Sequence, residues 1–71
     1  MKVALIGYGK MGHIIEKNLL VRGHSVVAKF NSEGINLSEL KKAEIAIEFS
    51  NPESAFTNIR TSIEANIPVV S

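Results

Sequence analysis

The sequence contains no cysteine and no tryptophan, and all seven of its acidic residues are glutamate. The absence of cysteine excludes a disulfide-stapled secreted scaffold and fits a reducing, cytoplasmic setting. The net charge is only +1, and the eight basic residues are scattered along the chain, so a basic patch for nucleic acid or for an acidic membrane surface is missing. No apolar run approaches the roughly 20 residues of a membrane-spanning helix. The composition therefore predicts a protein whose partners include neither nucleic acid nor membrane.

The chain has 71 residues, of which 45% are hydrophobic and 21% are charged. This balance is typical of a globular domain, but a domain of this size buries only a thin core. Residues 67–71 form an apolar, strand-like run that ends without a turn or a polar tail. An uncovered strand of this kind is a template for aggregation. We therefore expect residues 1–71 to be an incomplete N-terminal domain of a longer protein.

Strands and helices alternate in the predicted element order. Apolar runs over 2–6, 25–30, 44–49 and 67–70 predict four strands, and apolar spacing and cap residues predict helices over 11–22 and 37–42 and from 52 onward. Such alternation implies right-handed crossovers and a parallel sheet. The predicted fold class is α/β, a Rossmann-type half domain with a parallel four-stranded sheet, crossover helices and a truncated C-terminal end.

Individual residues predict the ends of the helices and the face of the third helix that packs on the sheet. Gly23 predicts the end of the first helix, and either Asn36 or Ser38 is expected to cap the second. The third is expected to begin with Asn51 as its N-cap and Pro52 at its first position. Its apolar side chains are expected to form one stripe facing the sheet. They are Ala55, Phe56, Ile59 and Ile63.

A glycine-rich turn lies directly between the first predicted strand and the first predicted helix. Its residues are Gly7, Tyr8, Gly9, Lys10, Met11 and Gly12, which form a G-x-G-x-x-G pattern. In this setting the first glycine permits a tight turn, the second lets a pyrophosphate approach the backbone, and the third lets the helix pack on the strand. The helix N-terminus then offers N–H groups to the phosphates. The pattern predicts a dinucleotide site, the alternative being glycines that serve only the turn.

The acidic residue that commonly follows the second strand of such a site is missing. The strand ends with Lys29 and Phe30, and Asn31 stands where a carboxylate would bind the ribose hydroxyls of NADH. Asn31 can still bond a ribose hydroxyl, and Lys29 could help neutralise a 2′-phosphate. The alternative is a solvated lysine followed by a turn-forming asparagine. The expected cofactor is NADPH or NADH, with a slight preference for NADPH.

The third predicted strand ends at Glu48, Phe49 and Ser50. If it pairs with the first strand on the side opposite the second, the backbone of Phe49 and Ser50 faces the glycine turn. Ligands of doubly wound sheets bind at this edge. Glu48 is the one charge in an apolar strand, and is interpreted either as a satisfied strand-end carboxylate or as a group near the nicotinamide ribose.

No metal site and no catalytic residue are predicted. His13 and His24 are eleven residues apart, with neither cysteine nor aspartate to complete a ligand set. Ser50 and Ser71 lack a partnered histidine in a hydrolase arrangement.

Three segments in this order and spacing resemble the 4-hydroxy-tetrahydrodipicolinate reductase (dihydrodipicolinate reductase) family. They are the opening residues 2–12, the strand end at 47–55 and the closing residues 67–71. The resemblance implies an NAD(P)H-dependent enzyme of the diaminopimelate route to lysine that reduces a cyclic dicarboxylate. It also implies that residues 7–12 bind the cofactor diphosphate, that Phe49 and Ser50 approach the nicotinamide, and that Asn31 contacts the adenosine ribose.

The resemblance places the catalytic and substrate-binding groups, and the surface of an expected homotetramer, outside this sequence. The residues alone leave two alternatives open. One is the half domain of another small dehydrogenase, and the other is a non-catalytic nucleotide-sensing module.

Overall fold

The computed structural model describes residues 1–7, 9–31, 34–50 and 52–70. Strands and helices alternate along them as predicted: β1 (Lys2–Ile6), α1 (Lys10–Val21), β2 (Ser25–Phe30), α2 (Leu37–Leu40), β3 (Ile45–Glu48), α3 (Pro52–Glu64) and β4 (Val69–Val70). Within this described part, no helix is both long and apolar enough to span a bilayer.

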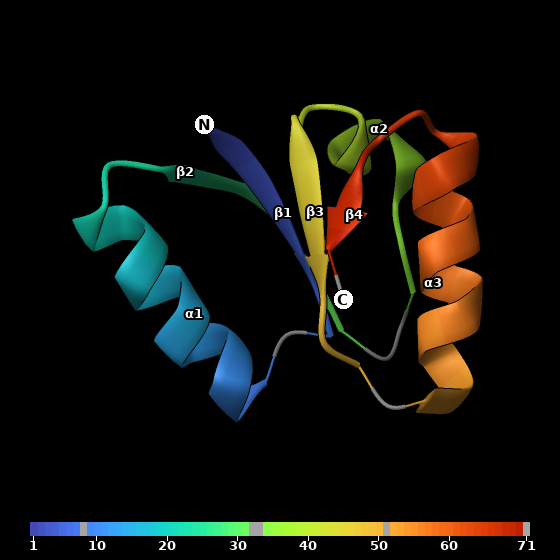
Figure 1. Cartoon of the computed structure of the whole chain (residues 1–71), viewed down its shortest axis with the longest axis horizontal. Coiled ribbons are helices and arrows are strands. Elements are labelled where there is room, and N and C mark those ends of the chain that lie inside the picture. The colour runs from blue at the N-terminus through green and yellow to red at the C-terminus, as the bar shows by residue number, and fades with distance from the viewer. Residues whose placement is uncertain (8, 32–33, 51, 71) are drawn as a thin grey trace.

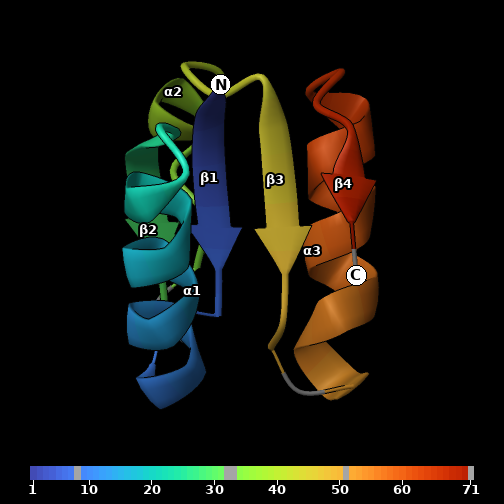
Figure 2. The same cartoon turned by 60° about the vertical axis from the view of Figure 1, so that its left-hand side comes forward.

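The strands form one parallel sheet in the order β2-β1-β3-β4. Figure 2 shows β1 and β3 side by side in its middle, with β4 beyond β3. Helix α1 lies on one face of the sheet, and α2 and α3 lie on the other (Figure 1). The chain therefore leaves β1 toward one face and β3 toward the opposite face. The predicted parallel, four-stranded α/β half domain is confirmed.

Strands β3 and β4 are shorter than predicted. Backbone pairing extends past both ends of β3, since the Glu44 N–H donates to Lys2 O at 2.8 Å and the Phe49 N–H donates to Ile6 O at 3.0 Å. These flanking residues are bonded to β1 but have left the regular ladder. Strand β4 begins only at Val69 because Pro68 has no N–H to donate.

The core lies between the sheet and the α2–α3 side. Ala4 pairs with Ala28 on one neighbouring strand and with Ala46 on the other, so three methyl groups lie level across the sheet. These small side chains leave room for Leu40, which is fully buried, and Ile67. Strand residues alternate between faces, so the buried Val3 and Leu5 of β1 face α1 instead.

Helices α1 and α3 end in the same hydrogen-bond pattern, a Schellman motif. After α1, the Gly23 N–H donates to Leu20 O and the His24 N–H to Leu19 O, and Gly23 has a φ of +85°. The predicted helix end at Gly23 is therefore confirmed. After α3, Asn66 takes the equivalent left-handed position with a φ of 61°, an ending that the sequence analysis does not predict.

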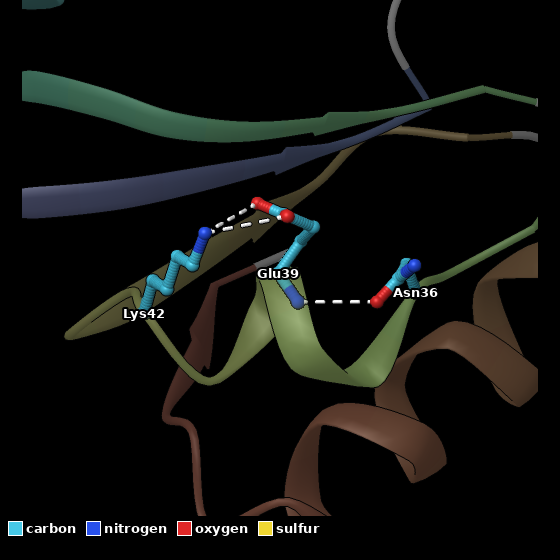
Figure 3. A network of polar contacts seen from close by, with 3 residues as sticks. All are labelled: Asn36, Glu39 and Lys42. Atoms are coloured by element: carbon cyan, nitrogen blue, oxygen red, sulfur yellow. Dashed lines mark hydrogen bonds and ion pairs between the residues drawn. The ribbon is translucent and has the colours of Figure 1, made fainter.

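Helix α2 is capped by Asn36, one of the two candidates. Figure 3 shows the Asn36 side-chain oxygen accepting a hydrogen bond from the Glu39 N–H, at 3.2 Å. The helix ends at Leu40 rather than at residue 42, and Lys42 forms an ion pair with Glu39 at 3.2 Å. The N-cap predicted for α3, Asn51, lies outside the described residues.

The predicted apolar stripe of α3 is wrong in half of its members. Phe56 and Ile63 are exposed by 73% and 62%, and with Ile59 they line an open surface groove of about 410 Å³. Ala55 and Ile59 are half-buried as expected. Among the described side chains of α3, the fully buried one is that of Ser62, whose hydroxyl donates to Asn58 O at 3.0 Å. A serine satisfied by its own helix can be buried at low cost, so apolar spacing alone does not identify the packed face.

Candidate cofactor-binding site

The turn after β1 is fixed by its neighbours on both sides. The Gly7 N–H donates to Phe30 O at 2.8 Å, at the end of β2. Gly7 has a φ of +96°, and a Cβ added to it would lie 2.7 Å from the backbone nitrogen of Ser50 and 2.8 Å from its Cα. Only glycine fits here, because a side chain would be strained in the backbone and would overlap the turn after β3.

The second glycine of the turn has open space in front of it. Gly9 is the N-cap of α1 with a φ of −158°, and a Cβ added there would meet nothing within 4 Å. It offers no side chain to cap the helix, and the first turn of α1 carries no acidic residue. The positive end of the helix dipole therefore meets an accessible stretch of backbone, an arrangement suited to an anion.

The remaining residues of the turn differ in exposure. Gly12 is buried, as close packing of α1 on the sheet requires, and the Met11 side chain is exposed. Tyr8 lies outside the described residues, and so does the side chain of Lys10. The structure therefore describes the backbone on either side of Tyr8.

The ends of β2 and β3 both meet the glycine turn. Asn31 directly follows Phe30, whose carbonyl is bonded to Gly7; Asn31 is exposed, and its own carbonyl accepts the Gly34 N–H at 3.1 Å. On the other side, the Phe49 N–H is bonded to Ile6, and the half-buried Ser50 touches Gly7. The strand order on which the prediction for Phe49 and Ser50 depended is therefore present.

A buried carboxylate lies beneath the turn after β3. Glu48 is only 3% exposed, and its Oε1 accepts hydrogen bonds from the Ser50 N–H and the Ser50 hydroxyl, each at 2.6 Å. The Asn58 side chain of α3 donates to the same hydroxyl at 3.1 Å. Among the described residues, Glu48 Oε2 has no hydrogen-bond partner. One oxygen is thus a satisfied strand-end acceptor, as one interpretation held; contact with a ribose stays a prediction.

Asn58 is the member of this cluster that the sequence analysis missed. Its signal is weak, because an amide two turns into a helix is ordinarily a surface residue. Only the placement of α3 over β3 brings it to Ser50.

Lys29 has a partner on α1. Its Nζ lies 3.1 Å from Glu16 Oε2, and the two side chains are 46% and 21% exposed. The lysine is therefore engaged beside the sheet, which weakens the interpretation that it serves a 2′-phosphate. Within the described part of the chain, no group of three or more His or Glu side chains could hold a metal ion.

Strands β1 and β3 are adjacent, and the chain leaves them toward opposite faces, so the glycine turn lies at the switch point of the sheet. The fold and this turn define an α/β domain of the Rossmann type, the class in which ligands bind at that crevice.

The comparisons place the chain more narrowly. Residues 1–71 match the family model described as "Dihydrodipicolinate reductase, N-terminus". The chain belongs to this family, and it matches the family's N-terminal part.

Curated relatives agree with this assignment, and those cited here carry the name 4-hydroxy-tetrahydrodipicolinate reductase. The relative from Christiangramia forsetii is 42% identical over 73 residues, which cover 100% of this chain and 30% of the relative. Relatives from Staphylococcus epidermidis and Staphylococcus saprophyticus are 33% and 34% identical, each covering 99% of this chain and 32% of the relative. The chain therefore spans about a third of the length of these relatives.

Proposed function

We propose that this chain is the cofactor-binding part of a 4-hydroxy-tetrahydrodipicolinate reductase of the diaminopimelate route to lysine, and that it binds NADH or NADPH. The observation that carries the proposal is the open backbone at Gly9. It lies at the N-terminus of α1, which has no side-chain cap, and follows β1 where the adjacent β3 leads to the opposite face of the sheet, in a chain that belongs to the reductase family.

Different residues along the C-terminal edge of the sheet would bind different parts of the cofactor. The glycine turn, residues 7–12, would take the diphosphate on its backbone N–H groups. Asn31, at the end of β2, would contact the adenosine ribose, and Phe49 and Ser50, at the end of β3, would lie toward the nicotinamide. The bound nicotinamide supplies the hydride, and the protein supplies its binding and orientation.

In this proposal the chain is an incomplete N-terminal dinucleotide-binding domain, and the rest of the activity belongs to a separate substrate domain beyond it. That domain would hold the small dicarboxylate substrate and the catalytic groups, and would form the homotetramer of a cytoplasmic enzyme. A slight preference for NADPH is also proposed, since no carboxylate follows β2 at Asn31 to repel a 2′-phosphate.

The test is titration of NADPH and NADH into the full-length reductase that contains this chain, followed by cofactor fluorescence. Gly9→Val would place a branched side chain in the open space and move the diphosphate off the backbone. The expected loss is about 2 kcal/mol or more of binding free energy, as for charge-assisted hydrogen bonds.

Ser38→Val is the control, because it introduces the same β-branched residue at an exposed position near the start of α2. We expect its cofactor dissociation constant to equal that of the wild type. Absence of saturable binding by the wild type would overturn the proposed function. An unchanged constant for Gly9→Val would show that the turn does not hold the diphosphate.

A further inference from the structure

Glu48 is buried at the point where the two chain segments around the proposed site touch. It ends β3, pairs with Ile6 at the end of β1, and is 3% exposed. Burying a carboxylate is costly unless hydrogen bonds compensate. One of its oxygens accepts two hydrogen bonds of 2.6 Å from Ser50. The other has no partner among the described residues. A neutral side chain of similar size would avoid that cost, so the carboxylate calls for an explanation.

The contacts of Ser50 supply one. Ser50 is bonded to Glu48 through both its backbone N–H and its hydroxyl, and to Asn58 of α3 through the hydroxyl. Hydrogen bonds to an ionised carboxylate are roughly twice as strong as neutral ones. Ser50 is therefore held from its own strand and from the helix that covers that strand, and its position relative to β3 is closely defined.

Gly7 packs directly against Ser50. The space that a Cβ of Gly7 would occupy is already filled by the backbone nitrogen, Cα and Cβ of Ser50, at 2.7–2.9 Å. The Gly7 N–H is bonded to the end of β2 on its other side. The turn after β1 is thus enclosed between the ends of β2 and β3. Displacement of Ser50 would remove one of the two walls that define the path of the glycine turn.

We propose that Glu48 is a positioning residue of the cofactor site, whose carboxylate holds Ser50 against Gly7 and so preorganises the glycine turn for the dinucleotide. The inference rests on the proposed function, because it assigns Glu48 a role in the affinity for that cofactor. Without the carboxylate, binding would have to order the turn, and the cost of ordering lowers the affinity.

If the carboxylate holds Ser50 in place, variants at position 48 of the full-length reductase should weaken NADPH binding to different degrees. Glu48→Asp keeps an acceptor that can reach the N–H two residues on, as aspartate does in Asx-turns, so its dissociation constant for NADPH should stay within about threefold of the wild type. Glu48→Gln keeps the size but loses the charge, and should be intermediate. Glu48→Ala should bind NADPH about tenfold more weakly, the loss typical of hydrogen bonds to a charged group.

Glu44 provides the matched control at the other end of the same strand. Its Oε1 accepts a hydrogen bond from the Lys2 N–H at 2.8 Å, so it too is a carboxylate bonded to the backbone. It lies at the N-terminal ends of the strands, however, away from the glycine turn. Glu44→Ala should leave the dissociation constant for NADPH unchanged.

A merely structural role for Glu48 is distinguished by two readouts. The endpoint of the titration gives the concentration of binding-competent sites, and the dissociation constant is calculated with that concentration. Misfolded protein therefore does not affect the measured constant. The KM for NADPH should rise in Glu48→Ala and Glu48→Gln, while the KM for the dicarboxylate substrate stays constant. If Glu48→Ala fails to fold, Asn58→Ala takes its place. It removes the α3 donor to Ser50 and should weaken NADPH binding by about threefold, as for one neutral hydrogen bond.

The proposal is overturned if Glu48→Gln, together with Glu48→Ala or Asn58→Ala, binds NADPH within about twofold of the wild type, a difference of under 0.5 kcal/mol. It is also overturned if both KM values rise together. These outcomes leave the proposed function intact as long as the wild type binds NADPH and Gly9→Val binds it more weakly. Absence of binding by the wild type would remove the proposed function itself.

Discussion

Gly7 and Gly9 are two residues apart in the same turn, but different neighbours constrain them. Gly7 has a positive φ, and Ser50 fills the space that a Cβ of Gly7 would need, whereas Gly9 has a negative φ and open space in front of it. The first glycine is therefore required by the fold. The fold leaves room for a side chain at Gly9, so the absence of one there would serve a bound ligand such as the cofactor diphosphate.

Gly7→Ala should destabilise the domain by about 2–4 kcal/mol, because the methyl group overlaps Ser50 and the backbone must hold a left-handed conformation. The measurement is chemical denaturation of the full-length reductase, with Gly9→Ala as the control. Gly9→Ala should cost less than about 1 kcal/mol, the difference between glycine and the less favourable alanine as an N-cap residue. Equal losses for the two variants would show that the contact with Ser50 does not constrain the turn.

Asn31→Asp tests the choice of cofactor at the end of β2. A carboxylate there would accept hydrogen bonds from the ribose of NADH and repel the 2′-phosphate of NADPH. Like charges about 4 Å apart at a partly exposed site interact by a few kcal/mol before screening, so we expect at least a tenfold shift toward NADH. The measurement is kcat/KM for both cofactors.

Lys29→Ala is the companion variant for this prediction. Its effect should have the same direction but be smaller, because the lysine is already paired with Glu16 across 3.1 Å and an exposed pair contributes little. A cofactor ratio that changes by less than about twofold in Asn31→Asp would identify Asn31 as a turn residue only, and the preference for NADPH would be withdrawn.

At the scale of the element, α2 depends on its first residue. The helix has four residues, too few to be stable without its cap and its tertiary contacts. Asn36→Ala removes the acceptor for the Glu39 N–H, and should lower the free energy of unfolding by about 1 kcal/mol. Ser38→Ala, inside the same helix, should change it by less than about 0.5 kcal/mol. Denaturation midpoints of the two variants that coincide would show that the Asn36 cap contributes nothing.

Helix α3 shows how the orientation of an element can depart from its apolar pattern. The predicted stripe included Phe56 and Ile63, yet the fully buried side chain among those described in α3 is that of Ser62. The rotation of the helix brings Asn58 to Ser50, where its amide finds a partner. The cap residues predicted where the helix begins, and its apolar spacing predicted which side chains would face the sheet. The structure packs a different face of the helix, the one that makes the polar contacts with the end of β3.

At the scale of the whole molecule, the chain carries the proposed cofactor-binding edge but no proposed catalytic group. It spans about a third of the length of its curated relatives. We therefore expect the 71-residue chain alone to show no reductase turnover at any concentration of NADPH or NADH. The measurement is NADPH oxidation with the dicarboxylate substrate, with the full-length reductase as the positive control. Turnover by the chain alone, above a buffer blank, would contradict the assignment of catalysis to another domain.

The sequence by itself determined the order of the elements, the parallel α/β fold class, the glycine turn and the family. These follow from local properties: apolar runs form buried strands, Gly23 ends a helix, and a G-x-G-x-x-G pattern between strand and helix permits only a few backbone paths.

Only the tertiary structure decided which groups meet around that turn. Ser50 lies 43 positions after Gly7, and the two touch because β3 takes its place beside β1 in the sheet. Glu48 is buried beneath the turn after β3, and the packing of α3 on that strand brings Asn58 to Ser50, while α1 brings Glu16 to Lys29. Such contacts join residues that are distant along the chain. Their partners are selected by the strand order and by the rotation of each helix on the sheet, neither of which a local pattern encodes.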